Sequence, residues 1–194
     1  MLFGRKKTTG EAFWTWFQKA NLLEASGGDF VEKVGPKLAE YHDGVVCEVG
    51  PGDQRPREFI ISADGLREHV DAVESLADAA PSLQDWKVTR FRPRMADYEA
   101  WGLRYDDTQI DPASMKFVAK RNDTLVDICL FVPWGDNPER RPDNAAFIML
   151  DIALGEYDVM CRVGHVEMHP LENAREDARP WKELRTVFDE LSAQ

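Results

Sequence analysis

A short run near the C-terminus alternates titratable with apolar residues: His165-Val166-Glu167-Met168-His169. In a β-strand successive side chains point to opposite faces, so the two histidines and Glu167 would share one face with Cys161. Imidazole and carboxylate groups are ligands for zinc, iron or nickel. The pattern therefore predicts a metal site at His165, Glu167 and His169, although a solvent-facing polar strand edge would show the same alternation.

Three arginines also alternate, Arg90, Arg92 and Arg94, at the end of a strand predicted over residues 86–92. On one strand face their guanidinium groups would converge and could hold a carboxylate or phosphate through paired hydrogen bonds. They stand out in a chain that is acidic overall, and they are our candidate site for an anionic ligand. The alternative is pairing with Asp or Glu on neighbouring strands, which we favour because cross-strand charge pairs are common.

A third candidate is Asp151, the one charged residue of a helix predicted over residues 144–154. Because this helix is apolar on every other side, Asp151 either is buried with a partner such as Arg162 or marks the exposed line of the helix. We expect structural pairing. Glu156 and Asp158 follow closely, but acids at a helix end do not define a catalytic acid–base pair unless their separation is known.

Motifs of the common enzyme classes are missing from the sequence. It contains no Gly-x-Ser-x-Gly nucleophile turn, no Gly-x-x-x-x-Gly-Lys phosphate loop and no Gly-x-Gly-x-x-Gly dinucleotide motif. Cys47, Cys129 and Cys161 form no Cys-x-x-Cys pair and lie in apolar runs. We therefore expect buried, reduced thiols and no cofactor.

Composition limits the partners. The chain has 24 Lys and Arg against 35 Asp and Glu, which gives a net charge of -11. Such a surface repels phosphate backbones and anionic lipids, so we expect neither nucleic-acid nor membrane binding. The basic start at residues 1–7 lacks the apolar stretch of a signal peptide, and no run approaches the ~18 apolar residues of a membrane helix. We expect a cytoplasmic location.

The elements that must position these residues are those of an α+β protein. Hairpins are predicted over residues 45–63 and 115–133, each followed by a helix and a strand, so a ββαβ order spans 45–93 and recurs over 115–170. The last strand is expected over residues 157–168. The recurrence indicates either a duplication or an accidental repeat of a common arrangement. A right-handed crossover predicts the strand order second-first-third in each unit.

We expect a single domain over residues 1–194, in which a largely antiparallel sheet, or two facing sheets, is built from the two ββαβ units with helices packed on it. Further helices are predicted at both ends of the chain. The first begins at a capping box of Thr8 and Glu11 and buries an apolar stripe at helical spacing: Phe13, Trp16, Phe17, Ala20 and Leu23. Trp14 lies off this stripe and would face a partner. A second helix is expected from about Asp29, with either a kink or a late helix start at Gly35-Pro36.

Four blocks of the sequence stand out: Phe13-Trp14-Thr15-Trp16-Phe17, residues 57–65 (REFIISADG), residues 86–93 (WKVTRFRP) and residues 150–158 (LDIALGEYD). Together they resemble a family of uncharacterised bacterial cytosolic proteins. The blocks are scattered over most of the chain. The resemblance implies a bacterial α+β protein and brings no activity or site residues with it.

Two classes of function remain open on the sequence. The first is a non-catalytic binding or interaction protein, with an anionic ligand at the arginines, a protein partner or a homo-oligomer. The alternative is a small hydrolase or metal-dependent enzyme that uses the face of Cys161, His165, Glu167 and His169.

Overall fold

The computed structural model describes residues 9–105, 108–133 and 143–193. The chain divides into two compact units, Met1–Arg92 and Pro93–Gln194, whereas the sequence led us to expect one domain. The expected helix cap at Thr8 and the basic start at residues 1–7 lie outside the described residues. No helix in the described part of the chain combines the length and the apolar character needed to cross a bilayer.

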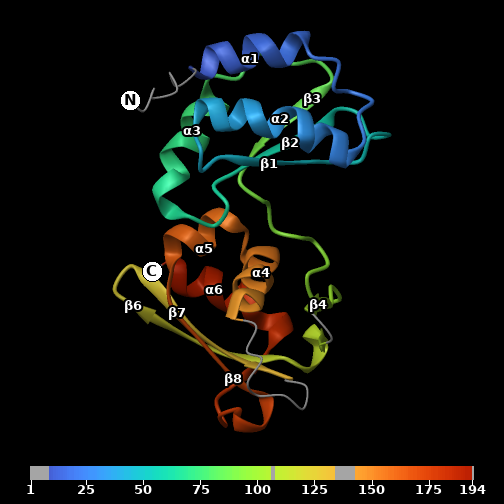
Figure 1. The fold of residues 1–194 in the computed structure, drawn as a ribbon. Coiled ribbons are helices and arrows are strands. Elements are labelled where there is room, and N and C mark those ends of the chain that lie inside the picture. The colour runs from blue at the N-terminus through green and yellow to red at the C-terminus, as the bar shows by residue number, and fades with distance from the viewer. Residues whose placement is uncertain (1–8, 106–107, 134–142, 194) are drawn as a thin grey trace, which may run out of the picture. The chain divides into compact units, whose positions relative to one another are not determined.

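The described part of the first unit places its helices and a small sheet in this order: α1 (Gly10–Lys19), α2 (Gly27–Tyr41), β1 (Val46–Val49), β2 (Arg57–Ser62), α3 (Val70–Asp78) and β3 (Trp86–Arg90). Strand β2 is central, antiparallel to β1 and parallel to β3 (Figure 1). Helix α2 begins at Gly27 and continues through Pro36, so the expected late start is wrong, and a kink at Pro36 stays a prediction.

The buried face of helix α1 differs from the predicted apolar stripe. Its N-cap is Thr9, whose side chain accepts a hydrogen bond from the amide of Ala12, one residue after the expected cap. The helix buries Trp14 together with Phe13 and Phe17. Trp14 therefore belongs to the core and does not face a partner.

The described part of the second unit begins with a small hairpin and continues into a second sheet that carries three helices. Its strands and helices are β4 (Leu103–Tyr105), β5 (Thr108–Ile110), β6 (Lys116–Asn122), β7 (Leu125–Val132), α4 (Asp143–Leu154), α5 (Glu156–Arg162), β8 (Val163–Pro170), β9 (Arg179–Pro180) and α6 (Leu184–Ser192). The larger sheet has the order β8-β7-β6-β9, with β8 parallel to β7 and the other pairs antiparallel.

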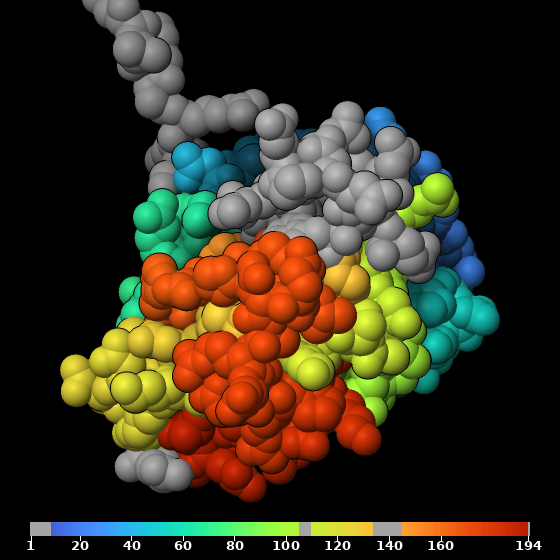
Figure 2. All heavy atoms as spheres, turned by 90° about the horizontal axis from the view of Figure 1, so that it is seen from below, coloured from blue at the N-terminus to red at the C-terminus, as the bar shows by residue number. Residues whose placement is uncertain are grey.

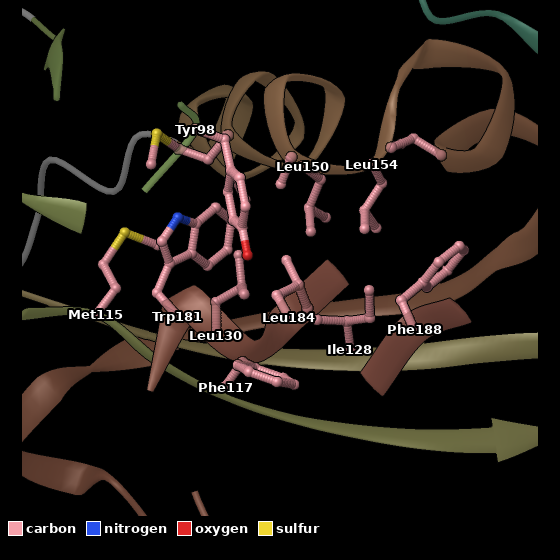
Figure 3. Packing of buried hydrophobic residues seen from close by; sticks show 14 of the residues in the cluster. Tyr98, Met115, Phe117, Ile128, Leu130, Leu150, Leu154, Trp181, Leu184 and Phe188 are labelled. Atoms are coloured by element: carbon pink, nitrogen blue, oxygen red, sulfur yellow. The ribbon is translucent and has the colours of Figure 1, made fainter. Parts of the chain in front are cut away.

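Helices cover one face of this larger sheet (Figure 1). Figure 3 shows Leu150 and Leu154 of α4 facing Ile128 of β7, with Leu184 and Phe188 of α6 beside them; all five side chains are buried. Because side chains alternate along a strand, the residues between these core positions point to the opposite face of the sheet. We call this opposite face, formed by β6, β7 and β8, the outer face.

Both units contain the predicted ββαβ arrangement, and the α+β class with a mostly antiparallel pattern is confirmed. The strand order is first-second-third in each unit, and the expected order second-first-third is wrong. The third strand pairs in parallel with the free edge of the second and does not cross over to the first. Descent of the two units from a duplication stays a prediction.

Candidate functional site

The strand that carries the predicted metal ligands begins later than the sequence indicated. Residues 156–162 form helix α5, and β8 starts only at Val163. Gly155, with φ of 82°, separates α4 from α5, a backbone conformation that glycine adopts without strain. Cys161 therefore lies on a helix, and its predicted place on the face of His165, Glu167 and His169 is wrong.

A different cysteine occupies that face. Cys129 of β7 lies directly opposite Glu167 of β8, and Phe131 lies opposite His169. The sulfur of Cys129, a carboxylate oxygen of Glu167 and a ring nitrogen of His169 all lie within 4.8 Å of one another. We call these three residues the ligand trio.

Glu167 connects the two histidines on the outer face. Its Oε2 lies 3.1 Å from His169 Nε2, and its Oε1 lies 3.2 Å from His165 Nε2. The hydrogen bond from His169, supported by the charge of His165, holds the pKa of Glu167 below its usual range. The two predicted histidines are thus brought together around one carboxylate, with His169 in the trio and His165 behind Glu167.

The environment of Cys129 favours the protonated thiol. Partial burial, and then the negative charge of Glu167, raise the pKa of Cys129. His169 is held in place on the other side by stacking on Phe131, with ring centroids 6.0 Å apart. A bound cation would reverse the preference of the thiol, because a metal ion stabilises the thiolate that binds it.

Two members of the trio, Cys129 and Glu167, line an open cleft of about 460 Å³ on the outer face. The polar and charged residues of its lining are Lys120, Asp127, Cys129, His165, Glu167, Arg175 and Asp177. Figure 2 views this side of the second unit, with β8 and the segment just after it in orange and the β6–β7 hairpin in yellow. Arg175 and Asp177 pair through two hydrogen bonds of 2.9 and 2.7 Å, so this wall of the cleft carries balanced charge.

The three arginines do not form the predicted clamp face. Strand β3 ends at Arg90, and Phe91 adopts φ of 59°, so the alternation along one strand stops there. Each guanidinium pairs with its own carboxylates: Arg90 with Asp78, Arg92 with Glu48 and Asp64, and Arg94 with Asp158 and Asp189. This arrangement matches the alternative of structural charge pairing.

Helix α4 is not buried on every side. Phe147 and Ile148 are exposed, and Asp151 is half-buried beside them. Arg162, the expected partner of Asp151, forms its ion pair with Asp158, 3.3 Å away.

All three cysteines are free; Cys47 is buried, and Cys129 and Cys161 are half-buried. Burial, and then the charge of Glu48, raise the pKa of Cys47 to about 12. At pH 8 in the presence of a chelator, a thiol reagent should therefore label Cys47 far more slowly than the other two, because both access and thiolate are lacking. Peptide mapping by mass spectrometry measures the order, and unfolded protein provides the control. Labelling of Cys47 first would contradict the burial.

Sequence reasoning missed Cys129, although a signal for it exists. Along β7, Asp127 and Cys129 alternate with the buried residues Val126, Ile128 and Leu130. A polar residue within this alternation marks the outward face of a half-buried strand. Cys129 was instead assigned to the core because it stands in an apolar run.

Comparison with known proteins adds no residue to this site: no family model, no curated protein and no solved structure matches the chain. The candidate site is therefore defined by two features of the second unit. One is the ligand trio on β7 and β8, and the other is the cleft beside it.

Proposed function

We propose that the second unit binds a first-row transition metal ion, with zinc as the reference ion, at Cys129, Glu167 and His169. The observation that carries the proposal is the closeness of the three ligand atoms, which lie within 4.8 Å of one another. Ligands of one tetrahedral zinc ion, each about 2.0–2.3 Å from the metal, are roughly 3.5 Å apart. Small side-chain rotations therefore bring the trio to coordinating distance.

The ligand types select the class of metal. Thiolate and imidazole favour zinc, cobalt, nickel and copper, whereas magnesium and calcium require oxygen ligands. Among the described residues the trio supplies three ligands, and the fourth position of a tetrahedral ion would be open to solvent or to a small molecule in the cleft. His165, hydrogen bonded to Oε1 of Glu167, would hold this carboxylate in orientation.

This proposal joins the two functional classes that the sequence left open. A site with three protein ligands and an accessible position suits an ion that performs chemistry, so a metal-dependent hydrolase is the enzymatic form of the proposal. Free cysteines support a cytoplasmic location, where thiols stay reduced. An anionic ligand at Arg90, Arg92 and Arg94 has less support, because these guanidinium groups already bind carboxylates.

Zinc titration with a competing chromophoric chelator tests the proposal. We expect wild-type protein to bind one zinc ion, and Cys129→Ser and His169→Gln to weaken binding by more than about a hundredfold, because each removes a direct ligand. Apparent affinity should rise with pH, since binding displaces the proton of a thiol whose pKa is raised.

The matched control is Cys161→Ser, the same substitution at the half-buried cysteine of α5. It should leave zinc affinity within about twofold, as sites without shared partners act independently. No zinc binding by the wild-type protein, or equal affinity in Cys129→Ser, would refute the proposed site.

A further inference from the structure

Strand β8 is irregular at the point where it meets β7. Val126 pairs with Val163, but Ile128 pairs with Val166, so two residues of β8 lie opposite Asp127 alone. These two residues are Gly164 and His165. Such an extra residue is a β-bulge, which changes the direction of the side chains that follow it.

The carboxylate of Asp127 fastens this bulge. Its Oδ1 accepts a hydrogen bond of 2.8 Å from the backbone amide of His165, and its Oδ2 accepts one of 2.9 Å from Asn122 Nδ2. These two bonds, the backbone one first, hold the pKa of Asp127 below its usual range. The backbone amide that a bulge leaves without a strand partner is thereby satisfied by a side chain.

Gly164 provides the space for this contact. A Cβ atom at position 164 would lie 2.3 Å from Oδ1 of Asp127, a separation too short for any pair of unbonded atoms. A residue with a side chain at this position would therefore push the carboxylate away from the His165 amide.

The bulge decides which residues of β8 face Cys129. Counting from the pair Val126–Val163 without the extra residue, Cys129 would lie opposite Val166, and Glu167 would lie opposite Leu130. Leu130 is fully buried in the helix-covered core. Because the side-chain period of a strand is two, a slip of one residue would turn Glu167 and His169 away from the outer face.

We infer that Asp127 and Gly164 are positioning residues of the metal site: together they hold the bulge that sets Glu167 opposite Cys129 and brings His169 into the ligand trio. This inference rests on the proposed metal-binding function, and it assigns a role to two residues that are not ligands themselves.

Cobalt(II) is the probe for the test, because its spectrum reports ligation as well as affinity. The sulfur-to-cobalt charge-transfer band reports the Cys129 bond, and the visible bands report the coordination geometry. In Asp127→Ala and Gly164→Ala we expect cobalt and zinc affinity to fall by about 10–100-fold, the usual effect of losing an outer-shell partner. We also expect a weaker sulfur band. Asp127→Asn, which keeps one acceptor oxygen for the His165 amide, should retain part of the affinity.

Two comparisons separate positioning from charge and from general damage. Asp177→Asn removes the same charge from the same cleft without touching the bulge, and it should change affinity less than about threefold. Gly164→Ala should add much less in the Asp127→Ala background, because Oδ1 of Asp127, the nearest atom to its Cβ, is gone and only the contact with Leu125 Cβ at 3.3 Å remains. Hydrogen exchange of the His165 amide gives a readout that needs no metal, and it should accelerate in both single variants.

The outcomes are distinct for the two proposals. Wild-type protein that binds no cobalt would overturn the metal site and this inference with it. Wild-type binding that persists unchanged, with the same sulfur band, in folded Asp127→Ala or Gly164→Ala would overturn the positioning role alone. An equal loss in Asp177→Asn would also overturn it, since charge would then explain the effect.

Discussion

Replacing Arg57 with methionine should lower the melting temperature by about 10 °C or more, although methionine keeps most of the length of the side chain. Arg57 is only 1% exposed. Its Nε donates to the carbonyl of Gly50 at 3.0 Å, and its Nη1 donates to the carbonyls of Leu22 and Leu23 at 3.2 and 2.9 Å. One guanidinium thus ties the loop after α1 to the turn between β1 and β2.

The energetic balance favours a large loss. A buried carbonyl without a donor costs ~1–3 kcal/mol, and the guanidinium also lies over two aromatic rings, 5.8 Å from the centroid of Phe30 and 5.7 Å from that of Trp86. Removing a buried charge recovers part of its desolvation cost. We therefore expect the free energy of unfolding to fall by roughly 2–4 kcal/mol. A domain the size of the first unit, Met1–Arg92, loses about 4–8 °C in melting temperature for each kcal/mol.

Arg55→Met is the control for Arg57→Met, because Arg55 is a neighbouring arginine whose ion pair with Glu24 is exposed to solvent. It should cost less than about 1 kcal/mol. Arg57→Lys should still be destabilising, since a single ammonium group cannot reproduce the planar fork that reaches three carbonyls. Equal melting temperatures for Arg57→Met and Arg55→Met, measured by circular dichroism, would contradict this account.

The sequence predicted the elements whose local signals agree. Both hairpins and the helices that follow them were found at nearly the right places, because turn residues and apolar alternation mark them together. The segment 157–162 failed because a short apolar run fits a buried strand and a buried helix equally well. Acidic residues in the first turn of α5 and Arg162 in its last turn suit a helix, and this weaker signal was the correct one.

The candidate site could be predicted only in part, and the reason is the pairing between strands. The alternation of His165, Glu167 and His169 was visible, and the structure places all three on the outer face. Their neighbour across the sheet was not visible, since Cys129 and Glu167 are separated by a long stretch of chain. The bulge at Gly164 is set by a contact with Asp127 on another strand, so no local pattern encodes it.

The two tryptophans of α1 show the same limit within one helix. Spacing alone assigned Trp16 to the core and Trp14 to the surface. In the structure Trp14 is 2% exposed, and its Nε1 donates to the carbonyl of Leu76 in α3 at 2.7 Å. Burying positions 13, 14 and 17 requires a different rotation of α1 about its axis from the one that the spacing indicated. Packing against β2 and α3 determines this rotation.

Trp14→Ala should therefore reduce the free energy of unfolding by ~3–5 kcal/mol, the usual cost of truncating a buried aromatic residue. The ring packs edge-on against Phe13, Phe17 and Phe59, with centroids 5.1, 5.3 and 5.8 Å away, so truncation leaves a cavity between α1 and β2. Trp14→Phe keeps much of this packing but removes the indole N–H that donates to the Leu76 carbonyl. Losing this donor should reduce the free energy of unfolding by ~1–3 kcal/mol.

Trp16→Ala supplies the matched comparison, because the same residue type is removed two positions away in the same helix. Trp16 is half-buried; it contacts the ring of Phe13, and Lys37 Nζ lies 6.0 Å from its ring centroid. Its loss should cost about 1–2 kcal/mol, in proportion to the smaller area it buries. Urea unfolding measures the stabilities of the three variants. We expect Trp14→Ala to be the least stable, and Trp14→Phe and Trp16→Ala to lie between it and the wild type. If Trp16→Ala were the least stable variant, the packing of α1 on β2 would have to follow the stripe that spacing indicated.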